Sequence, residues 1–464
     1  MGWLDRKHSI APPGFNRWLV PPAALAVHLC IGQAYATSVY KTALVKHFGV
    51  SLTEIGVIFS IAIVMLGLSA AIMGTWVDRN GPRMAMFTSA MFWAGGFLIG
   101  SLGIFTHQLW LVYVGYGVIG GIGLGIGYIS PVSTLIKWFP DRPGLATGMA
   151  IMGFGGGALI ASPVSTALLK LYDPNSGDKG WVASGDAVGK LFLTLAVVYL
   201  AYMLFGALTI RVPHEGWRPA GFDPAKVKTA ALVTTENVSA KNAIKTRQFW
   251  LLWIALFCNV SAGIGILEQA APMIQDFFRK SDGASLVSAA VAAGFVGLLS
   301  IGNMAGRFAW SATSDVVGRK RVYMMYLGVG AVLYTVLALA GSTTTILYVA
   351  LAVVIISFYG GGFSTAPAYL RDLFGTFQVG AIHGRLLTAW SAAGVAGPLI
   401  VNGILDAQGK PGQLNAASYQ PALLTMVVLL VIGFVANLLI KPVDARFHEP
   451  RPEHGLPNKS TMEA

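Results

Sequence analysis

The chain is a series of long apolar runs separated by shorter polar segments. Each run is close to the ~20 residues that an α-helix needs to cross the hydrocarbon core of a bilayer. The pattern therefore predicts an all-α membrane protein with twelve spans. We place these at residues 18–40, 54–76, 84–105, 110–137, 144–168, 191–210, 250–274, 286–314, 322–341, 346–370, 382–405 and 420–440.

The polar segments divide these spans into two groups of six. The longest segment, Arg211 to Gln248, falls near the middle of the chain. After Lys441 the chain is rich in proline and charge, which is typical of disordered tails. The sequence thus predicts an N-terminal segment at 1–17, a six-helix bundle at 18–210, a central loop at 211–249, a second bundle at 250–441 and a disordered tail at 442–464.

Composition agrees with a membrane protein. Of the 464 residues 55% are hydrophobic and 11% are charged, whereas a soluble domain has about 25% charged residues. Arg6, Lys7 and Arg17 precede the first run, but no small-residue cleavage pattern follows it, so we expect this span to be retained. The two cysteines, Cys30 and Cys258, both lie in apolar runs, which excludes a disulfide framework and a cysteine metal cluster.

The positive charges are distributed unevenly between the two sides of the predicted membrane. With the N-terminus inside, 23 of the 32 Lys and Arg residues fall in the inner segments and eight in the outer loops. This bias predicts a multi-pass protein of the cell (inner) membrane with both termini and the central loop in the cytoplasm. It also explains the net charge of +12 without a nucleic-acid partner. We expect a monomer in contact with the lipid bilayer.

The one remaining basic residue, Arg307, lies inside a span. Asp315 follows it by eight residues at a charged helix end, so Arg307 is roughly 12 Å deep in a core whose half-thickness is about 15 Å. Inserting such a charge costs at least ~2.5–3.5 kcal/mol. No acidic residue lies in the middle of a span, and Glu54 and Glu268 come nearest. Arg307 is therefore expected to await a transient anion; the alternative is a structural role in capping carbonyls or bracing a loop.

The second half of the chain repeats the first. The segment Gly74-x-x-x-Asp78-Arg79-x-Gly81-Pro82-Arg83 follows span two, and Ser311-x-x-x-Asp315-x-x-Gly318-Arg319 follows span eight. Three landmarks keep an offset of 235 to 237 residues: Asp78 with Asp315, Pro131 with Pro367 and Pro163 with Pro398. Two parallel six-helix repeats are typical of secondary transporters, whose substrate site lies between the halves at mid-membrane. We expect gating or structural roles for Asp78, Arg79, Arg83, Asp315 and Arg319.

These loops resemble the signature loop of the major facilitator superfamily. The glycine-rich segment 120–128, the segment 259–263, Arg307 and the segment 387–390 resemble, more narrowly, the oxalate:formate antiporter family and its monocarboxylate-carrying relatives. The resemblance implies the twelve-helix fold of that superfamily and transport by alternating access. In the oxalate carrier of this family a basic residue in span eight and a second in span eleven hold a dicarboxylate. Arg307 matches the first, but Trp390 stands at the second position.

This departure points to a substrate with one negative charge. One guanidinium pairs with one carboxylate in a bidentate manner, and a second carboxylate would lack its cation. We therefore expect lactate, pyruvate, formate or a protonated dicarboxylate such as oxalate to be exchanged or carried alone. Two alternatives remain open: a carrier of another organic anion or a drug, with Arg307 structural, and a carboxylate sensor that does not transport.

Other polar and aromatic groups inside spans complete the expected site, because amides and phenols donate hydrogen bonds to carboxylates. The candidate ligands are Arg307, Gln33, Tyr35, Tyr128, Tyr359, Trp390, Asn259 and Phe363. For each the alternative is a helix–helix hydrogen bond or packing. His28 in span one is a candidate proton site, against a neutral histidine bonded to a neighbour. With no nucleophile triad, metal constellation or phosphate loop in the sequence, we expect neither an enzyme nor a cofactor or metal.

Overall fold

The structure, a computed structural model, describes residues 2–50, 52–174, 183–222, 232–234, 236–279, 285–287, 289–409 and 414–449. Over these ranges the chain is helical, and β-type pairing is limited to three isolated bridges. Eleven helical segments of this part are long and apolar enough to cross a membrane. A further long helix, α11 (Ala289–Val317), carries Arg307. The prediction of an all-α membrane protein is confirmed.

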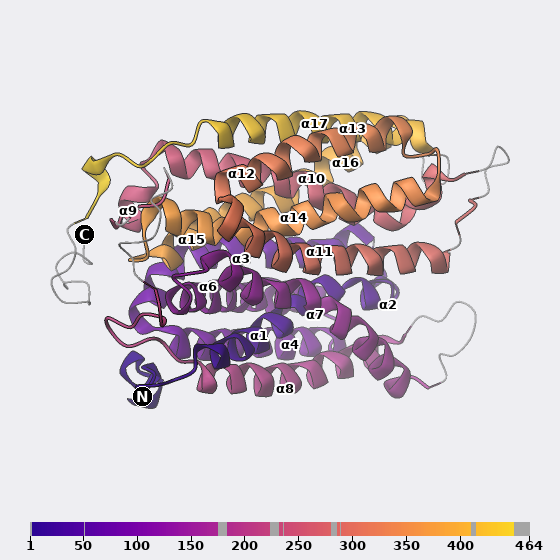
Figure 1. The fold of residues 1–464 in the computed structure, drawn as a ribbon. Coiled ribbons are helices and arrows are strands. Elements are labelled where there is room, and N and C mark those ends of the chain that lie inside the picture. Colours follow the sequence, from indigo (N-terminus) through magenta and orange to yellow (C-terminus); the bar gives the residue numbers. More distant parts are fainter. Residues whose placement is uncertain are drawn as a thin grey trace.

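The two halves of the chain form two adjacent helix layers, the first coloured indigo to magenta and the second pink to yellow (Figure 1). The first contains α1 (Val20–Ile31), η4 (Gly32–Ala36), α2 (Ser38–Phe48), α3 (Leu52–Asn80), α4 (Pro82–Phe105), α5 (Leu109–Val112), η5 (Tyr113–Gly120), α6 (Gly121–Trp138), α7 (Pro143–Tyr172) and α8 (Gly185–Thr209). The second contains α10 (Arg247–Phe277), α11, α12 (Arg319–Met324), η7 (Met325–Val329), α13 (Gly330–Ala340), α14 (Thr345–Phe374), α15 (Val379–Leu386), α16 (Thr388–Gln408) and α17 (Ala416–Leu438).

Span one is interrupted where it crosses α7. Its backbone changes from the α-helix α1 to the tighter turn η4, which begins at Gly32. A Cβ built on Gly157 of α7 would lie 2.6 Å from the Gly32 Cα, so no larger residue fits at this crossing. The close approach brings Tyr35 against Phe154 of α7, with ring centroids 5.0 Å apart. Two glycines thus determine where the first aromatic side chain of the site lies.

The halves meet along two sets of helices near the middle of the molecule. Helix α7 packs against α11 and α14, and α3 packs against α15 and α16. Side chains on the facing sides of these helices therefore lie between the halves. Ser391 of α16, for example, donates to the backbone carbonyl of Ile63 in α3 at 2.9 Å.

We call the end of the molecule that carries residues 2–16, α9 (Ala240–Ala243) and residues 441–449 the terminal end (Figure 1). Here each half caps a helix of the other. Asp315 accepts the N–H groups of Gly144 and Leu145, both at 2.8 Å, in the first turn of α7. Asp78 accepts the N–H of Ala381 near the start of α15 at 3.0 Å. These first-turn N–H groups have no partner within their own helix, so the two carboxylates join the halves at the terminal end.

The other predicted gating residues lie around these two contacts. Arg319 pairs with Asp315 at 2.5 Å and with Asp372 at 3.2 Å, both within the second half. Arg83 donates to the carbonyls of Trp3 and Leu208 and so holds the N-terminal segment against the first half. Arg79 is exposed at the end of α3.

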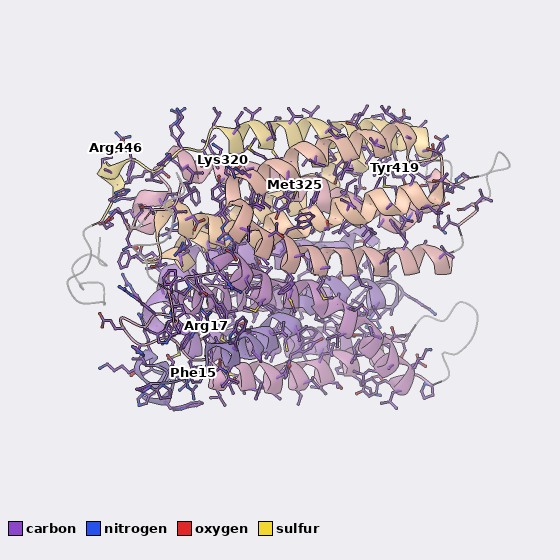
Figure 2. All side chains as sticks on the ribbon, viewed as in Figure 1. Phe15, Arg17, Lys320, Met325, Tyr419 and Arg446 are labelled. Atoms are coloured by element: carbon purple, nitrogen blue, oxygen red, sulfur yellow. The ribbon has the colours of Figure 1, made fainter. Side chains whose placement is uncertain are left out.

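The polar segments at the terminal end also contact one another. Arg17, labelled in Figure 2, pairs with Asp141 at 2.6 Å within the first half. A bridge joins Asn237 of the central segment to Glu449, after the short turn η8 (Ala445–Phe447). Residues 450–464 of the predicted tail lie outside the described residues, and the domain boundaries remain predictions.

Candidate functional site

Arg307 lies at the centre of the interface between the halves and is fully buried. Its stem passes between glycines of two helices. A Cβ on Gly155 of α7 would lie 3.2 Å from its Cδ and Nε, and one on Gly360 of α14 would lie 3.2 Å from its Cγ. The slot for this side chain is therefore built by glycines from both halves of the chain.

The guanidinium of Arg307 is only partly hydrogen-bonded. Its Nε donates to Oδ1 of Asn303, one turn earlier in α11, at 3.0 Å. Neither Nη1 nor Nη2 has a hydrogen-bond partner among the described residues, and no salt bridge to Arg307 is present in that same part of the chain. Asn303 thus fixes the direction of the guanidinium and leaves its two outer nitrogens available for an acceptor.

Two phenylalanines, one from each half, support this charge. The Cζ atom of Arg307 lies 5.0 Å from the ring centroid of Phe363 in α14 and 5.7 Å from that of Phe154 in α7. A guanidinium within ~6 Å of a ring face gains roughly 0.5–1 kcal/mol, and about 2 kcal/mol or more when water is excluded. The rings therefore offset part of the cost of burying the cation without neutralising it.

Trp390 and Tyr128 complete the wall around these rings. Trp390 of α16 lies 4.9 Å from Phe363 and 5.7 Å from Phe154, measured between centroids. Tyr128 of α6 lies 5.5 Å from each of the same two phenylalanines. All four rings are at most 1% exposed. The guanidinium is thus enclosed by aromatic side chains from four different helices.

Four polar atoms around the arginine, like its two outer nitrogens, are buried without a hydrogen-bond partner in the described part of the chain. They are the hydroxyls of Tyr35, Tyr128 and Tyr359 and the indole Nε1 of Trp390. The charge of Arg307 acts on all three phenols. The Tyr359 phenol faces the Tyr35 hydroxyl and the Trp390 indole N–H, without a hydrogen bond of normal geometry to either. An unpaired buried polar group costs about 1–3 kcal/mol, so each of these atoms would gain from a hydrogen-bonding partner.

Two of the predicted ligands lie apart from this cluster. Gln33 donates to the hydroxyl of Tyr40 at 2.9 Å and accepts from that of Tyr116 at 3.1 Å, which uses its amide inside the first half. Asn259 of α10 lies behind Tyr359, beside a cavity of about 10 Å³ within the second half. Its Oδ1 atom has no partner there. The structure therefore places Asn259 next to the site and Gln33 away from it.

Three contributors were not anticipated from the sequence: Asn303, Phe154 and His383. Asn303 precedes Arg307 by four residues, a spacing at which helical side chains meet, so it could have been found. Phe154 has no distinguishing signal among the apolar residues of its span. His383 of α15 is 2% exposed, and its ring lies 5.8 Å from that of Tyr128.

A larger cavity of about 50 Å³ lies away from the arginine, at the terminal end of the first half. Arg6, Asp78, Ser130 and Lys137 line it. Because it contains an acid flanked by two bases and is distant from the aromatic cluster, we assign it to the surroundings of the Asp78 contact and not to the candidate site. The aromatic cluster itself is closely packed, which is the arrangement of an occluded site.

Comparison with known proteins agrees with this architecture. The family model described as Major Facilitator Superfamily matches residues 23–398, with a second match at 295–463. The chain is 25% identical to the oxalate:formate antiporter of Oxalobacter formigenes over 430 residues, 92% of this chain and 93% of the relative. It is 27% identical to the apicoplast pyruvate carrier 1 of Toxoplasma gondii, over 71% of this chain and 66% of the relative.

Among solved structures, the fold is similar to that of FucP, a major facilitator transporter crystallised in the outward conformation. The TM-score is 0.64 at 15% identity, and the match covers 90% of this chain and 97% of FucP. The predicted resemblance to the superfamily, and within it to the oxalate:formate antiporter and monocarboxylate carriers, is confirmed.

Proposed function

The chain belongs to the Major Facilitator Superfamily and is a multi-pass membrane transporter, and we propose that it carries small carboxylate anions by alternating access around Arg307. The observation that carries this proposal is the pair of buried guanidinium nitrogens, Nη1 and Nη2, that lack an acceptor within the described residues. The two relatives named above carry oxalate, formate or pyruvate according to their names, and they support the same substrate class.

The energetics of Arg307 favour a transient anion over a permanent structural role. Breaking a buried ion pair by removing one partner costs about 3–5 kcal/mol, because it leaves an uncompensated charge. A carboxylate that accepts from both outer nitrogens forms a bidentate pair, the strongest arrangement available to a guanidinium. We propose that the same carboxylate also accepts from hydroxyls of Tyr35, Tyr128 and Tyr359, which lack a hydrogen-bond partner among the described residues. Binding therefore satisfies several groups at once.

The charge of the site favours a monocarboxylate. Arg307 is the one cationic side chain that faces this cluster in the described part of the chain, and Trp390 fills the position from which a second cation would act. A second carboxylate would be desolvated without a partner. We propose lactate, pyruvate or formate, or oxalate with one proton, as substrates, moved by exchange or uniport.

We further propose that the terminal end faces the cytoplasm, as the excess of Lys and Arg in its segments indicates. In the arrangement described here Asp78 and Asp315 close that end. Release of these two contacts would open the site to the cytoplasm, and their formation closes that route.

The test is exchange of radiolabelled lactate, pyruvate, formate and oxalate by purified protein in proteoliposomes. Arg307→Gln should abolish exchange, because a neutral amide cannot pair with a buried carboxylate, while the variant elutes and unfolds like the wild type. Arg446→Gln removes an arginine whose side chain is 73% exposed at the terminal end and should leave exchange unchanged. Full exchange by Arg307→Gln would reject Arg307 as the ligand.

A further inference from the structure

His28 of α1 is fully buried next to the candidate site, and both of its ring nitrogens face backbone carbonyls. Its Nδ1 makes a short contact with the carbonyl oxygen of Ala150 in α7. Its Nε2 lies 3.1 Å from the carbonyl oxygen of Tyr128 in α6. Three helices of the first half therefore hold the ring in one orientation.

This geometry suits a histidine with two protons. A neutral imidazole has one N–H and one lone pair, so it can donate to only one of the two carbonyls. In that form the other carbonyl oxygen faces the lone pair of the second nitrogen. The imidazolium donates from both nitrogens and satisfies both contacts. The two carbonyls thus form a ready site for one additional proton.

Burial of the His28 ring opposes the charge of an imidazolium, and the charges around the ring add to that cost. The charged and titratable groups that face it are Arg307 of α11, His383 of α15 and the phenol of Tyr128. From α7 it meets the Ala150 carbonyl, and α8 approaches α1 through Gly206. The unpaired charge of Arg307 repels an imidazolium in the same enclosure, where little water screens it. An anion on Arg307 cancels this repulsion.

We propose that His28 is a proton-binding site linked to anion binding at Arg307, so that one carboxylate and one proton occupy the carrier together. This inference rests on the proposed function and adds its coupling. The proton comes from the buffer acid in the solvent, which is left as its conjugate base, and adds to the free lone pair of the imidazole; no bond of the substrate is broken. With one anion and one proton bound, the site has the same net charge as the empty site, which holds Arg307 alone.

His383 is the competing position for this proton. Its ring also lies against Tyr128, from the second half of the chain. It differs from His28, whose ring contacts two carbonyls, because the described ranges contain no such pair of contacts to the His383 ring. The two histidines can be separated by experiment because they lie on different helices and can be replaced singly.

Calorimetry measures the linkage directly. Binding of pyruvate, lactate and formate to the purified protein is titrated in two buffers with different ionisation enthalpies, which gives the number of protons taken up per anion. We expect about one proton for the wild type. The affinity for the anion should then fall by about tenfold for each unit that the pH rises, over the range in which the free protein holds no proton on His28. One-proton linkage requires this slope.

Single substitutions identify the histidine that takes up the proton. His28→Gln keeps an amide that can donate to both carbonyls but accepts no proton, so anion binding should persist with proton uptake near zero. His214→Gln, at an exposed histidine outside the site, should keep the uptake of the wild type. Uptake that disappears in His383→Gln and survives in His28→Gln overturns the assignment.

Two results with the wild-type protein alone would overturn the proposal. Anion binding with a heat that does not depend on the buffer overturns the linkage and leaves the proposed function intact. Failure of every acid to bind overturns the proposed function and the linkage with it.

Discussion

Asp315→Asn should open the terminal end. The Asp315 carboxylate caps α7 by accepting the N–H groups of Gly144 and Leu145, both at 2.8 Å. An asparagine keeps one acceptor but directs an NH₂ at the second N–H, and it lacks the charge that a helix N-terminus favours. Loss of such a cap costs ~1–2 kcal/mol. Because the contact exists only when the halves meet here, and about 1.4 kcal/mol is a factor of ten, the open population should rise by about 5–30-fold.

The ion pair between Asp315 and Arg319 does not change this estimate, because it lies within the second half and persists in either arrangement. Nitroxides at the exposed Lys7 and Lys441, one in each half at the terminal end, report the opening through their distance distribution by double electron–electron resonance. Cys30 and Cys258 are buried, which restricts labelling to the introduced cysteines.

The matched control removes an aspartate that does not join the halves. Asp186 pairs with Lys190 within α8 at 2.7 Å, and both side chains are about half exposed. Asp186→Asn should therefore leave the distances unchanged, whereas Asp315→Asn should add a population at longer distance. Identical distributions in the two variants would refute the idea that the Asp315 cap holds this end closed.

Two further predictions concern selectivity and charge in the site. Trp390→Lys adds a second cation to the aromatic wall and should shift exchange from formate toward oxalate dianion, measured as the ratio of the two initial rates; an unchanged ratio removes Trp390 from the site. Asn303→Asp places a resident carboxylate at the position of Oδ1, which lies 3.0 Å from the Arg307 Nε, so it should abolish carboxylate binding in a thermal-shift assay. Asn303→Ala removes one hydrogen bond, about 1 kcal/mol, and should lower the affinity for the carboxylate by only about fivefold. Equal binding by the two variants would contradict a site that depends on an unpaired arginine.

The spans and the arginine could be predicted from sequence because both follow from the cost of polarity in a bilayer. A charge inside an apolar run must face the protein interior, and the structure places Arg307 there, between the halves. The aspartates of the repeated loops were predictable in the same way, since they stand at helix ends. Their partners were not, because Gly144 and Ala381 are bound through backbone N–H groups that carry no sequence signal.

The direction of side chains was less predictable. Gln33 lies in η4, where three residues complete a turn in place of 3.6, so counting faces along a regular helix misplaces it. It therefore turns to Tyr40 and Tyr116, while Tyr35, two residues later, meets Phe154. His383 was placed at a span edge because the apolar run begins at residue 382, whereas the helix starts at Val379 and brings the ring to Tyr128.

The construction of the wall implies a coupling between binding and closure. Phe154 belongs to the first half and Phe363 to the second, and both support the Arg307 guanidinium. When the halves separate, one of these rings must withdraw, and water then reaches the cation. An anion consequently gains its strongest electrostatic attraction only in the closed arrangement, where the effective dielectric is lowest. Substrate binding should therefore stabilise the occluded state over either open one, as a carrier requires when it must not stay open to both sides.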